Sequence, residues 1–361
     1  MMQGDTMRKY VIQPGDTLSK IAYRNNVRID DIVRNNHHLP SKDSYLSIGD
    51  FLSIPEPHTT KQIHSKENHI ACHNEYGWRE LEDDRERLGV SIYQKKIGWS
   101  RLGKPIWLFR VGKGKKRICY SGTWHGNEWL NTWLLMKFLM EIERKYRNHE
   151  SWHHVNIRAV LDEEVTLYFL PLVNPDGAEL VQEGLQRTHS FFDEIHTINE
   201  GFHCYKHWSA NAAGVDLNHQ WPAGWKRESD TSPQRPFPRH YGGEAPLTEP
   251  ETRAVYQLTM EEEFDIVLAF HSQGEEIYWG YQHLEPPESR AMAEKLAKAS
   301  SFRAVQTADS SAGYKDWFIK EFRRPGFTIE TGVGQNPLSI TSAARIWITT
   351  VPLLLETLTW G

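Results

Sequence analysis

The sequence contains few cysteines. Its 361 residues include three, Cys72, Cys119 and Cys204, and no two of them form a C-x-x-C motif. Three cysteines cannot all pair, and this usage is typical of a reducing compartment in which thiols stay reduced. We therefore interpret the three cysteines as structural residues.

Long apolar runs are also missing. No stretch of about 18 apolar residues occurs, so the sequence predicts no transmembrane helix and no membrane partner. The first ten residues, MMQGDTMRKY, lack the apolar core of a signal peptide, which makes ordinary secretion unexpected. These absences predict a cytoplasmic protein.

Neither sign of charge dominates the chain. Lys and Arg number 42, Asp and Glu number 47, and the formal net charge is −5 at pH 7. This balance is not that of a protein whose main partner is nucleic acid or an anionic membrane, so substrate chemistry must come from local residues. The length predicts two domains, one of which can be small.

Residues 117–140 combine a short apolar run with a long helical pattern. Residues 118–121 are typical of a strand, and apolar side chains recur from Trp129 to Met140 at the spacing of a largely buried helix. The turn between them carries His125 and Glu128. Because ligands bind where strand ends meet helix starts in α/β sheets, this pair indicates a metal-binding or catalytic position.

Spacing alone does not distinguish this pair from a chance match. The same H-x-x-E pattern occurs at His64 and Glu67, inside the polar segment EPHTTKQIHSKENHI of residues 56–70. That segment has Pro, Thr, Lys and His without hydrophobic periodicity, which is typical of a linker. Since a polar segment without a core holds no third ligand in place, we interpret His64 and Glu67 as solvated residues.

From about residue 73 onward, predicted strands and helices alternate. The continuous apolar run TLYFLPLV is typical of a strand buried on both faces. Thr248 is the predicted N-cap of a later helix, with Pro250 in its first turn and Glu251 completing a capping box. The alternation predicts an α/β fold with a mixed, mostly parallel sheet flanked by helices. We expect strands at 90–96, 106–111, 117–121, 166–173, 265–270 and 326–330, and helices at 76–88, 249–262, 288–300 and 343–358.

Two of the later apolar runs end at chemistry-bearing residues. DIVLAF is followed by His271, and GFTIE ends in Glu330. Because the strand ends of such a sheet converge, His125, Glu128 and His271 can supply two nitrogens and one carboxylate to a catalytic zinc ion, with the fourth position left for water. Glu330 is then the free carboxylate that takes a proton from this water and passes it to a leaving amine. The sequence therefore predicts one zinc ion.

Residues 9–55 form a separate compact unit. The segments YVIQPGDTLSKIAYRNNVRIDDIVRNN and LSIGDFLSIP contain a strand, a turn, two helices and a second strand, and Asp16 or Thr17 can cap the first helix. This unit resembles a LysM module, a small βααβ domain. The resemblance implies binding of N-acetylglucosamine chains of peptidoglycan or chitin, in a groove beside the turn of Gly15, Asp16 and Thr17. A packing module without a ligand is the alternative.

The larger region resembles the zinc carboxypeptidase family, the carboxypeptidase A-like peptidases. The resemblance implies a zinc peptidase with the three ligands and the catalytic glutamate named above. It also implies that Asp216 is the carboxylate that orients the ring of His125. The motifs, in order, are GTWHGNE, PLVNPDG, GVDLN, AFHSQG, AGYKDWF and TIETG. We thus predict a LysM peptidoglycan-binding module over residues 1–57, a linker over 58–72 and a zinc carboxypeptidase-like catalytic domain over 73–361.

Departures from the family pattern affect the predicted substrate site. Where the family has an Asn-Arg pair that grips a terminal carboxylate, this chain has Asn218 and His219, and a His is charged only part of the time near neutral pH. The family's oxyanion-stabilising Arg is missing, which leaves Ser209 and the neighbouring Lys206 as candidates. The family's substrate-closing tyrosine is absent near residue 308, and Tyr314 is the nearest one. We predict substrate contacts from Asn218, His219 and Tyr314.

Within the family, bacterial γ-D-glutamyl-meso-diaminopimelate endopeptidases resemble this chain best, because they couple LysM modules to this domain and lack the Asn-Arg pair. The segment DLNHQWPAGW resembles their version of the motif. The resemblance implies cleavage of peptidoglycan stem peptides between γ-D-glutamate and diaminopimelate. The subgroup includes sporulation enzymes without a signal peptide, so the expected location is the cytoplasm, and an association with sporulation or the spore stays open. The alternatives are a carboxypeptidase acting on free C-termini, a deacylase of small amides, and a non-catalytic peptidoglycan-binding protein.

Lys315 leads to a prediction about substrate specificity. In the family, the residue before the Asp-Trp of AGYKDWF lies at the floor of the pocket for the side chain that follows the scissile bond, and this chain has Lys315 there. A partly desolvated lysine needs a negative partner. We predict that Lys315 pairs with the distal carboxylate of diaminopimelate. The alternative is a lysine turned to solvent or bound to a carboxylate of its own chain.

Overall fold

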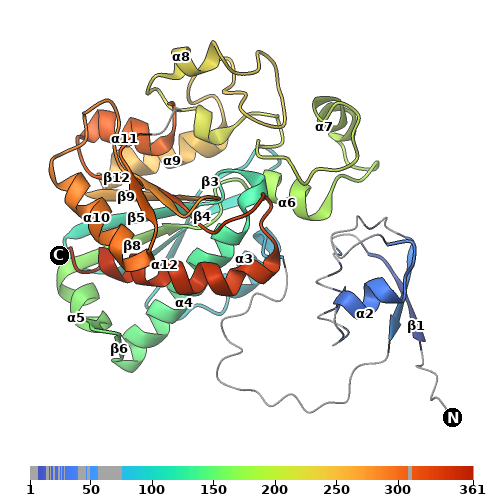
Figure 1. Cartoon of the computed structure of the whole chain (residues 1–361), viewed down its shortest axis with the longest axis horizontal. Coiled ribbons are helices and arrows are strands. Elements are labelled where there is room, and N and C mark those ends of the chain that lie inside the picture. The colour runs from blue at the N-terminus through green and yellow to red at the C-terminus, as the bar shows by residue number, and fades with distance from the viewer. Residues whose placement is uncertain are drawn as a thin grey trace.

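The computed structural model describes residues 7–13, 16, 18, 21–22, 25, 27, 29–39, 46, 49–55, 75–307 and 311–360 (Figure 1). Gly15, Thr17, the predicted linker over 58–72 and much of the first predicted LysM helix lie outside these residues. Within the described residues, the hydrophobic core of the N-terminal region is separate from that of the C-terminal region.

Among its described residues, the N-terminal region contains two antiparallel strands and the helix α2. β1 (Met7–Val11) pairs with β2 (Phe51–Pro55), and α2 (Ile29–Arg34) packs against β2. After α2, the Asn36 side chain bonds the backbone of Ser53, with Nδ2 2.8 Å from its O and Oδ1 2.8 Å from its N. These contacts close a small core that includes Ile12, Leu18, Ile21, Ile32, Leu52 and Ile54.

The C-terminal region is built on an eight-stranded sheet in the order β11-β10-β12-β9-β5-β8-β4-β3. The pairs β11–β10, β12–β9, β9–β5 and β5–β8 are parallel, and the pairs β10–β12, β8–β4 and β4–β3 are antiparallel. This confirms the predicted mixed, mostly parallel sheet. Its strands are β3 (Tyr93–Trp99), β4 (Pro105–Gly112), β5 (Lys116–Gly122), β8 (Val165–Leu170), β9 (Ile266–His271), β10 (Glu276–Tyr278), β11 (Arg303–Val305) and β12 (Gly326–Glu330).

Helices cover both faces of this sheet (Figure 1). One face packs against α4 (Leu130–Asn148), α10 (Glu288–Ser300) and α12 (Ala343–Thr357). The other face packs against α9 (Pro250–Glu262) and α11 (Tyr314–Phe322). The remaining elements are α3 (Trp78–Arg85), β6 (Ser151–Trp152), β7 (Val155–Asn156), α5 (Ile157–Ala159), the π-helical turn η3 (Val160–Glu164), α6 (Pro175–Glu183), α7 (Phe192–Ile198), α8 (Trp225–Ser229) and the 3-10 turns η2 (Gly126–Glu128), η4 (Leu217–His219) and η5 (Ile340–Ser342).

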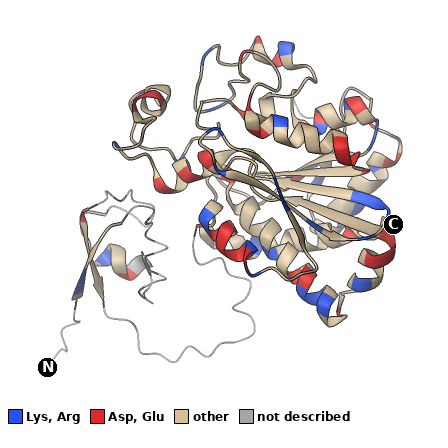
Figure 2. Ribbon diagram, turned by 180° about the vertical axis from the view of Figure 1, so that it is seen from behind, with Lys and Arg blue, Asp and Glu red and all other residues tan. Residues whose placement is uncertain are grey.

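The central strands are apolar and enclosed. Every residue of β8 and β9 is buried, and Figure 2 shows these inner strands largely without charge while Lys, Arg, Asp and Glu gather on the surrounding helices. The predicted strand over 166–173 ends at Leu170, because Pro171 has no backbone N–H to continue the ladder. In the described part of the chain, no helix combines the length and apolar character needed to cross a membrane.

The start of α9 differs from the prediction. Glu249 is the N-cap and makes no side-chain cap bond. Thr248 Oγ1 instead donates to Gln220 Oε1 at 3.0 Å, and Glu251 Oε1 accepts from Arg101 N at 2.8 Å. The predicted capping box was therefore wrong, because contacts with distant segments occupy both side chains. Pro250 lies in the first turn, as predicted.

Candidate metal centre and active site

His125 and Glu128 lie at the turn that follows β5. His125 precedes η2, Glu128 ends it, and α4 begins two residues later. Gly126 allows close packing here, since a Cβ would lie 2.4 Å from the carbonyl carbon of Gly177 in α6. Gly126 N also donates to Ser209 O at 3.0 Å. Packing and hydrogen bonding together fix the turn that carries both side chains.

His271 and Glu330 lie side by side at the ends of β9 and β12. The two strands are parallel, and their register places Glu330 opposite His271. Thr331 follows, and its N and Oγ1 both donate to His271 O, at 2.8 and 3.1 Å. β9 also pairs with β5, the strand that leads to His125. Three neighbouring strand ends therefore bring the four predicted residues together.

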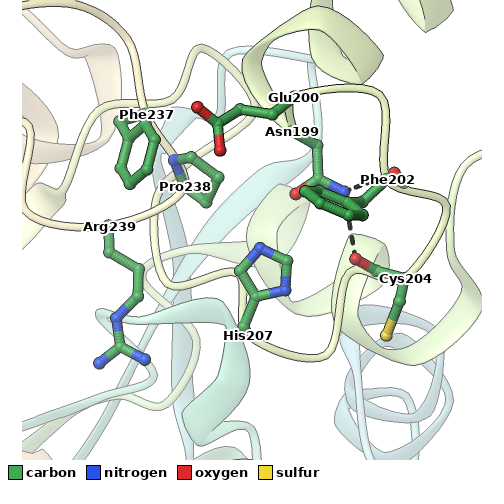
Figure 3. Close-up of a pocket in the computed structure, with 8 residues that line it drawn as sticks. All are labelled: Asn199, Glu200, Phe202, Cys204, His207, Phe237, Pro238 and Arg239. Carbon is green, nitrogen blue, oxygen red and sulfur yellow. Dashed lines mark hydrogen bonds between the residues drawn. The ribbon is translucent and has the colours of Figure 1, made fainter.

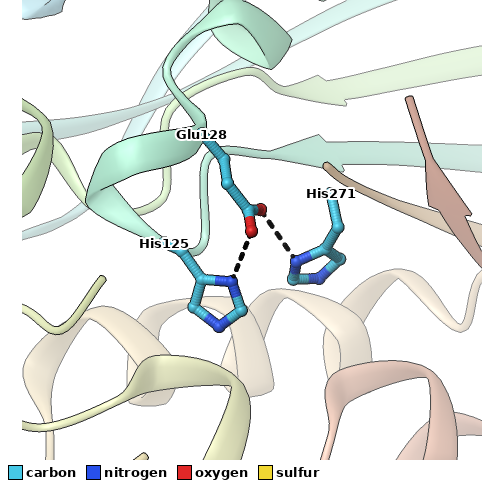
Figure 4. Close-up of side chains that lie close together, drawn as sticks. All are labelled: His125, Glu128 and His271. Carbon is cyan, nitrogen blue, oxygen red and sulfur yellow. Dashed lines mark hydrogen bonds and ion pairs between the residues drawn. The ribbon is translucent and has the colours of Figure 1, made fainter. Parts of the chain in front are cut away.

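The three predicted ligands meet around one carboxylate (Figure 4). His125 Nδ1 lies 2.9 Å from Glu128 Oε1, and His271 Nδ1 lies 3.1 Å from Glu128 Oε2. Each residue offers a ligand atom within 4.8 Å of the others. Two imidazole nitrogens and a carboxylate oxygen form the donor set of catalytic zinc sites, in which a fourth position stays open. The residues present therefore fit a zinc ion.

Electrostatic interactions keep the Glu128 carboxylate ionised. Burial opposes the charged form of His125, but the carboxylates of Glu128 and Asp216 raise its pKa well above the usual range. Burial also opposes ionisation of Glu128, yet the two imidazoles lower its pKa to about 2. His271 Nε2 is buried without a hydrogen-bond partner among the described residues. Because metal ligands must be deprotonated, an ionised Glu128 is suited to binding a cation.

Asp216 holds the opposite edge of His125. Its Oδ1 lies 3.1 Å from His125 Nε2 and accepts from Asn218 N at 3.1 Å, while Oδ2 accepts from His240 N at 3.0 Å. A carboxylate in this position fixes the ring and leaves Nδ1 to face the metal. Asp216, His219 and His240 form a second group with ligand atoms within 4.8 Å of one another. In that group, however, both oxygens of Asp216 already serve the contacts just described.

Glu330 faces the same cavity, which has a volume of about 290 Å³. Burial, followed by repulsion from Glu128, raises the pKa of Glu330 well above its usual range. Its side chain makes no hydrogen bond or ion pair with another residue in the described part of the chain. Glu330 is thus free to exchange a proton with water in the cavity. The cavity is lined by His125, Asn127, Glu128, Ser209, Asp216, His219, Arg239, His240, Ser272, Gln273, Tyr278, Glu330 and Asn336.

Several lining residues lie outside the predicted motifs. Asn336 Nδ2 donates to Glu128 Oε1 at 3.4 Å and to Ser272 O at 2.6 Å, so it supports the metal centre. Tyr278 donates to Glu276, and burial is the first cause that raises the Tyr278 pKa to about 12. Neither residue follows a long apolar run, which is the signal that revealed the metal ligands. The residues missed in this way are Arg239, His240, Tyr278 and Asn336.

The structure does not bring Tyr314 to the cavity. Its ring is fully buried against Trp124 and Trp221, at centroid distances of 5.2 and 4.8 Å, and its OH lies 3.0 Å from Thr259 Oγ1. The predicted substrate contact of Tyr314 was wrong, because the ring belongs to an aromatic core beneath α11.

Lys315 is also buried. Its Nζ lies 2.5 Å from Asp316 Oδ1 and donates to Gly280 O at 2.8 Å. These contacts support the alternative in which Lys315 binds a carboxylate of its own chain, so we do not assign it to diaminopimelate. Lys315 does not line the cavity described above.

The other substrate candidates divide into two groups. Ser209 and His219 line the cavity. Lys206 does not, because its Nζ turns to Glu75 at 3.4 Å, and this contact does not support its predicted oxyanion role. Asn218 does not line the cavity either, and its Oδ1 accepts from the first backbone N–H of α11 at 3.2 Å. Its contact is with the protein itself.

In the N-terminal region, Asp16 is buried, with 7% of its surface exposed. Its Oδ2 accepts from Tyr10 OH at 2.7 Å and from Gln13 N at 2.8 Å. These bonds stabilise the turn, as Asp side chains commonly do, and they do not support the predicted glycan contact of Asp16. The other two predicted glycan residues, Gly15 and Thr17, lie outside the described residues.

Sequence comparisons match both regions of the chain. Residues 90–342 match the zinc carboxypeptidase family, and residues 10–55 match the LysM domain. The chain is 44% identical over 251 residues to γ-D-glutamyl-L-diamino acid endopeptidase 1 of Lysinibacillus sphaericus. The aligned region covers 70% of this chain and 63% of that enzyme. It is 38% identical over 268 residues to the uncharacterized protein YqgT of Bacillus subtilis, which covers 73% of this chain and 71% of that protein.

Solved structures match the fold. Bovine thrombin-activatable fibrinolysis inhibitor superposes with a TM-score of 0.59 at 16% identity, over 79% of this chain and 96% of that one. A metallo-carboxypeptidase from Pseudomonas aeruginosa superposes with a TM-score of 0.51 at 18% identity, over 79% of this chain and 69% of that one. At these identities the likeness concerns the fold alone.

Proposed function

The chain belongs to the zinc carboxypeptidase family, and on that premise we propose that it is a zinc peptidase that hydrolyses the γ-D-glutamyl-diaminopimelate bond of peptidoglycan stem peptides. The observation that carries the proposal is the convergence of His125, Glu128 and His271 beside the free Glu330. The Lysinibacillus relative is, by its name, an endopeptidase for γ-D-glutamyl-L-diamino acids, and this chain spans 63% of its length. The relative supports the choice of bond.

The site residues divide the work of hydrolysis. A zinc ion held by the three ligands would polarise the scissile carbonyl and lower the pKa of a water molecule. Asp216 keeps the ring of His125 in its ligating orientation. Glu330 accepts a proton from the attacking water, whose oxygen bonds to the γ-carbonyl carbon. Glu330 then donates the proton to the diamino acid nitrogen as the C–N bond breaks.

The LysM module gives the proposed enzyme a second contact with the same polymer. We assign it the glycan strand, while the stem peptide enters the cavity. Binding the strand raises the effective concentration of stem peptides around the tethered catalytic domain, without adding any contact in the active site. Peptidoglycan is thus the proposed partner of both domains.

Digestion of defined stem peptides, with fragments weighed by mass spectrometry, tests the proposed function. We expect one cut, before diaminopimelate, that a chelator abolishes and zinc restores. Release of single C-terminal residues from ordinary peptides would instead identify a carboxypeptidase acting on free C-termini. No cut in any peptide, together with sedimentation of the protein with peptidoglycan, would identify a non-catalytic binding protein.

Glu330→Gln tests the proton-transfer step. The variant should keep zinc and lose at least about a hundredfold in turnover, because general acid–base catalysis contributes on that order. Glu321→Gln is the matched control, since Glu321 is an exposed carboxylate on α11 outside the cavity. A loss below tenfold for Glu330→Gln would remove Glu330 from this role.

A further inference from the structure

Arg239 is the single Lys or Arg among the described residues that line the metal cavity. Its side chain is exposed, and it makes no hydrogen bond or ion pair with any residue in the described part of the chain. Three acids, Glu128, Asp216 and Glu330, line the same cavity. Because a guanidinium stays charged and carries five N–H donors, Arg239 presents unused donors to a molecule that enters.

The backbone on both sides of Arg239 is fixed. Pro238 O accepts from Ser209 N at 3.0 Å and from Ser209 Oγ at 3.2 Å. His240 N donates to Asp216 Oδ2 at 3.0 Å. Asp216 is the carboxylate that also holds His125, the ligating histidine that precedes η2. The position of Arg239 is therefore tied to the metal centre, and recognition there needs little ordering of the loop.

The nearest acid of the adjoining pocket does not neutralise Arg239. Figure 3 shows that pocket, with the guanidinium of Arg239 far from the carboxylate of Glu200. Glu200 instead lies 3.8 Å from Arg235. The lysines predicted to bind substrate are occupied as well, Lys206 by Glu75 and Lys315 by Asp316. Among the described residues that line the metal cavity, Arg239 is therefore the Lys or Arg left for an acidic ligand.

We propose that Arg239 binds a carboxylate of the substrate and makes the enzyme selective for acidic stem peptides. The inference rests on the proposed function. A γ-linked glutamyl residue keeps a free α-carboxylate on the acyl side of the scissile bond, and a diamino acid can bring carboxylates on the amine side. A guanidinium pairs with a carboxylate through two parallel N–H···O bonds, whereas an ammonium acts as a point charge. Arg239 thus offsets the repulsion that the three cavity acids exert on such a substrate.

Three peptides test this role. The first is the γ-D-glutamyl-diaminopimelate peptide, the second carries a carboxamide in place of the glutamyl α-carboxylate, and the third carries carboxamides in place of the diaminopimelate carboxylates. Wild type should prefer the first peptide over one of the two analogues by about tenfold or more in kcat/KM, and tenfold corresponds to about 1.4 kcal/mol. Arg239→Gln should bring that ratio close to one. The analogue affected identifies the carboxylate that Arg239 binds.

Two further variants sharpen the comparison. Arg239→Lys keeps the charge without the planar fork and should retain part of the preference. Arg235→Gln removes an exposed arginine of the same loop that does not line the cavity, so its ratio should equal that of wild type. All variants should keep zinc. If Arg239→Gln left the ratios for both analogues unchanged, the proposed role would be overturned.

A binding measurement separates this inference from the proposed function. Calorimetry of the same peptides with Glu330→Gln, and with Glu330→Gln combined with Arg239→Gln, reads carboxylate preference without turnover. Turnover by wild type without any preference dependent on Arg239 would retain the function and overturn the role of Arg239. A binding preference that depends on Arg239, without turnover by wild type, would retain the role of Arg239 and overturn the proposed function. If neither turnover nor a binding preference were observed, the proposed function and the role of Arg239 would both be overturned.

Discussion

Both histidines of the candidate metal centre contact Glu128, one on each carboxylate oxygen. This arrangement has a physical reason, because two imidazoles and a carboxylate that converge on one point leave their lone pairs facing a common centre. His125 is held there by Asp216, and the strand end that carries His271 is held by Thr331. Loss of a single ligand should therefore lower the metal affinity more than it lowers the stability of the fold.

We expect His271→Ala to lose tightly bound zinc, because the two remaining ligands are fewer than the three of catalytic zinc sites. Metal analysis after dialysis should give far less zinc per chain than wild type. His283→Ala removes an exposed imidazole outside the cavity and should keep its zinc. One tightly bound zinc and full hydrolysis in His271→Ala would show that the ligand assignment is wrong.

Glu251 allows a prediction for stability that does not involve the metal centre. It is fully buried in α9, and burial is the first cause that raises its pKa to about 8. The folded chain therefore keeps the Glu251 proton between pH 4.5 and 8, while the unfolded chain releases it. Unfolding then releases a proton, so this residue lowers stability as pH rises through that window, on the order of 1 kcal/mol per pH unit.

Glu251→Gln should remove this slope, because the amide stays neutral and keeps an oxygen for Arg101 N. The comparison is the free energy of unfolding by urea at pH 5, 6.5 and 8, with excess zinc in every sample. The variant should gain stability relative to wild type as pH rises. Glu261→Gln, on the exposed side of the same helix, should run parallel to wild type. Equal slopes for wild type and Glu251→Gln would contradict the prediction.

Residues that follow long apolar runs could be predicted from sequence, whereas loop residues could not. His271 and Glu330 end buried strands, and their patterns imply a shared edge of the sheet. Arg239 lies in RPFPRHYGG, a segment without periodicity, and only folding brings it beside Ser209 and Asp216. Such contacts join segments far apart in the chain, so no local pattern indicates them.

At the level of elements, the length of a helix or strand decided whether it could be predicted from the sequence. The long helices α10 and α12 and the apolar strands β9 and β12 occur where predicted. β10 and β11 have three residues each, too few for alternation to be recognised. β10 pairs with β12 and carries Tyr278 into the cavity wall. Because β10 was not predicted, the contribution of Tyr278 to the cavity was not predicted either.

The first turn of α11 leads to a prediction about stability instead of specificity. Lys315→Met would leave Asp316 buried without its ammonium partner, which typically costs about 3 to 5 kcal/mol. The free energy of unfolding should fall accordingly, while the ratio of hydrolysis of diaminopimelate and lysine peptides stays unchanged. Lys320→Met, on the exposed part of the same helix, should have a small effect. A changed ratio with unchanged stability would return Lys315 to the substrate pocket.

At the scale of the whole molecule, the described residues form three separate hydrophobic cores, one in the LysM region and two in the larger region. The core of the LysM region involves residues 12–54, and the cores of the larger region begin at residue 76. The order of the two regions could be predicted from sequence because each carries its own compact pattern, and both family matches confirm it. The predicted glycan contact of Asp16 is not supported, because its carboxylate accepts from Tyr10 and Gln13 of its own turn.

Because the cores are separate, we expect the proposed catalytic region to act on small substrates without the LysM module. A chain that starts at residue 73 should hydrolyse short stem peptides at the wild-type rate, since every residue that lines the metal cavity lies beyond that point. On insoluble peptidoglycan the same chain should sediment poorly and release fragments more slowly, because the tether no longer concentrates stem peptides around the site. Sedimentation and fragment release are compared with those of the full chain. Equal sedimentation of the two would show that the LysM module does not bind the wall, and slower hydrolysis of short peptides would show that it contributes to the active site.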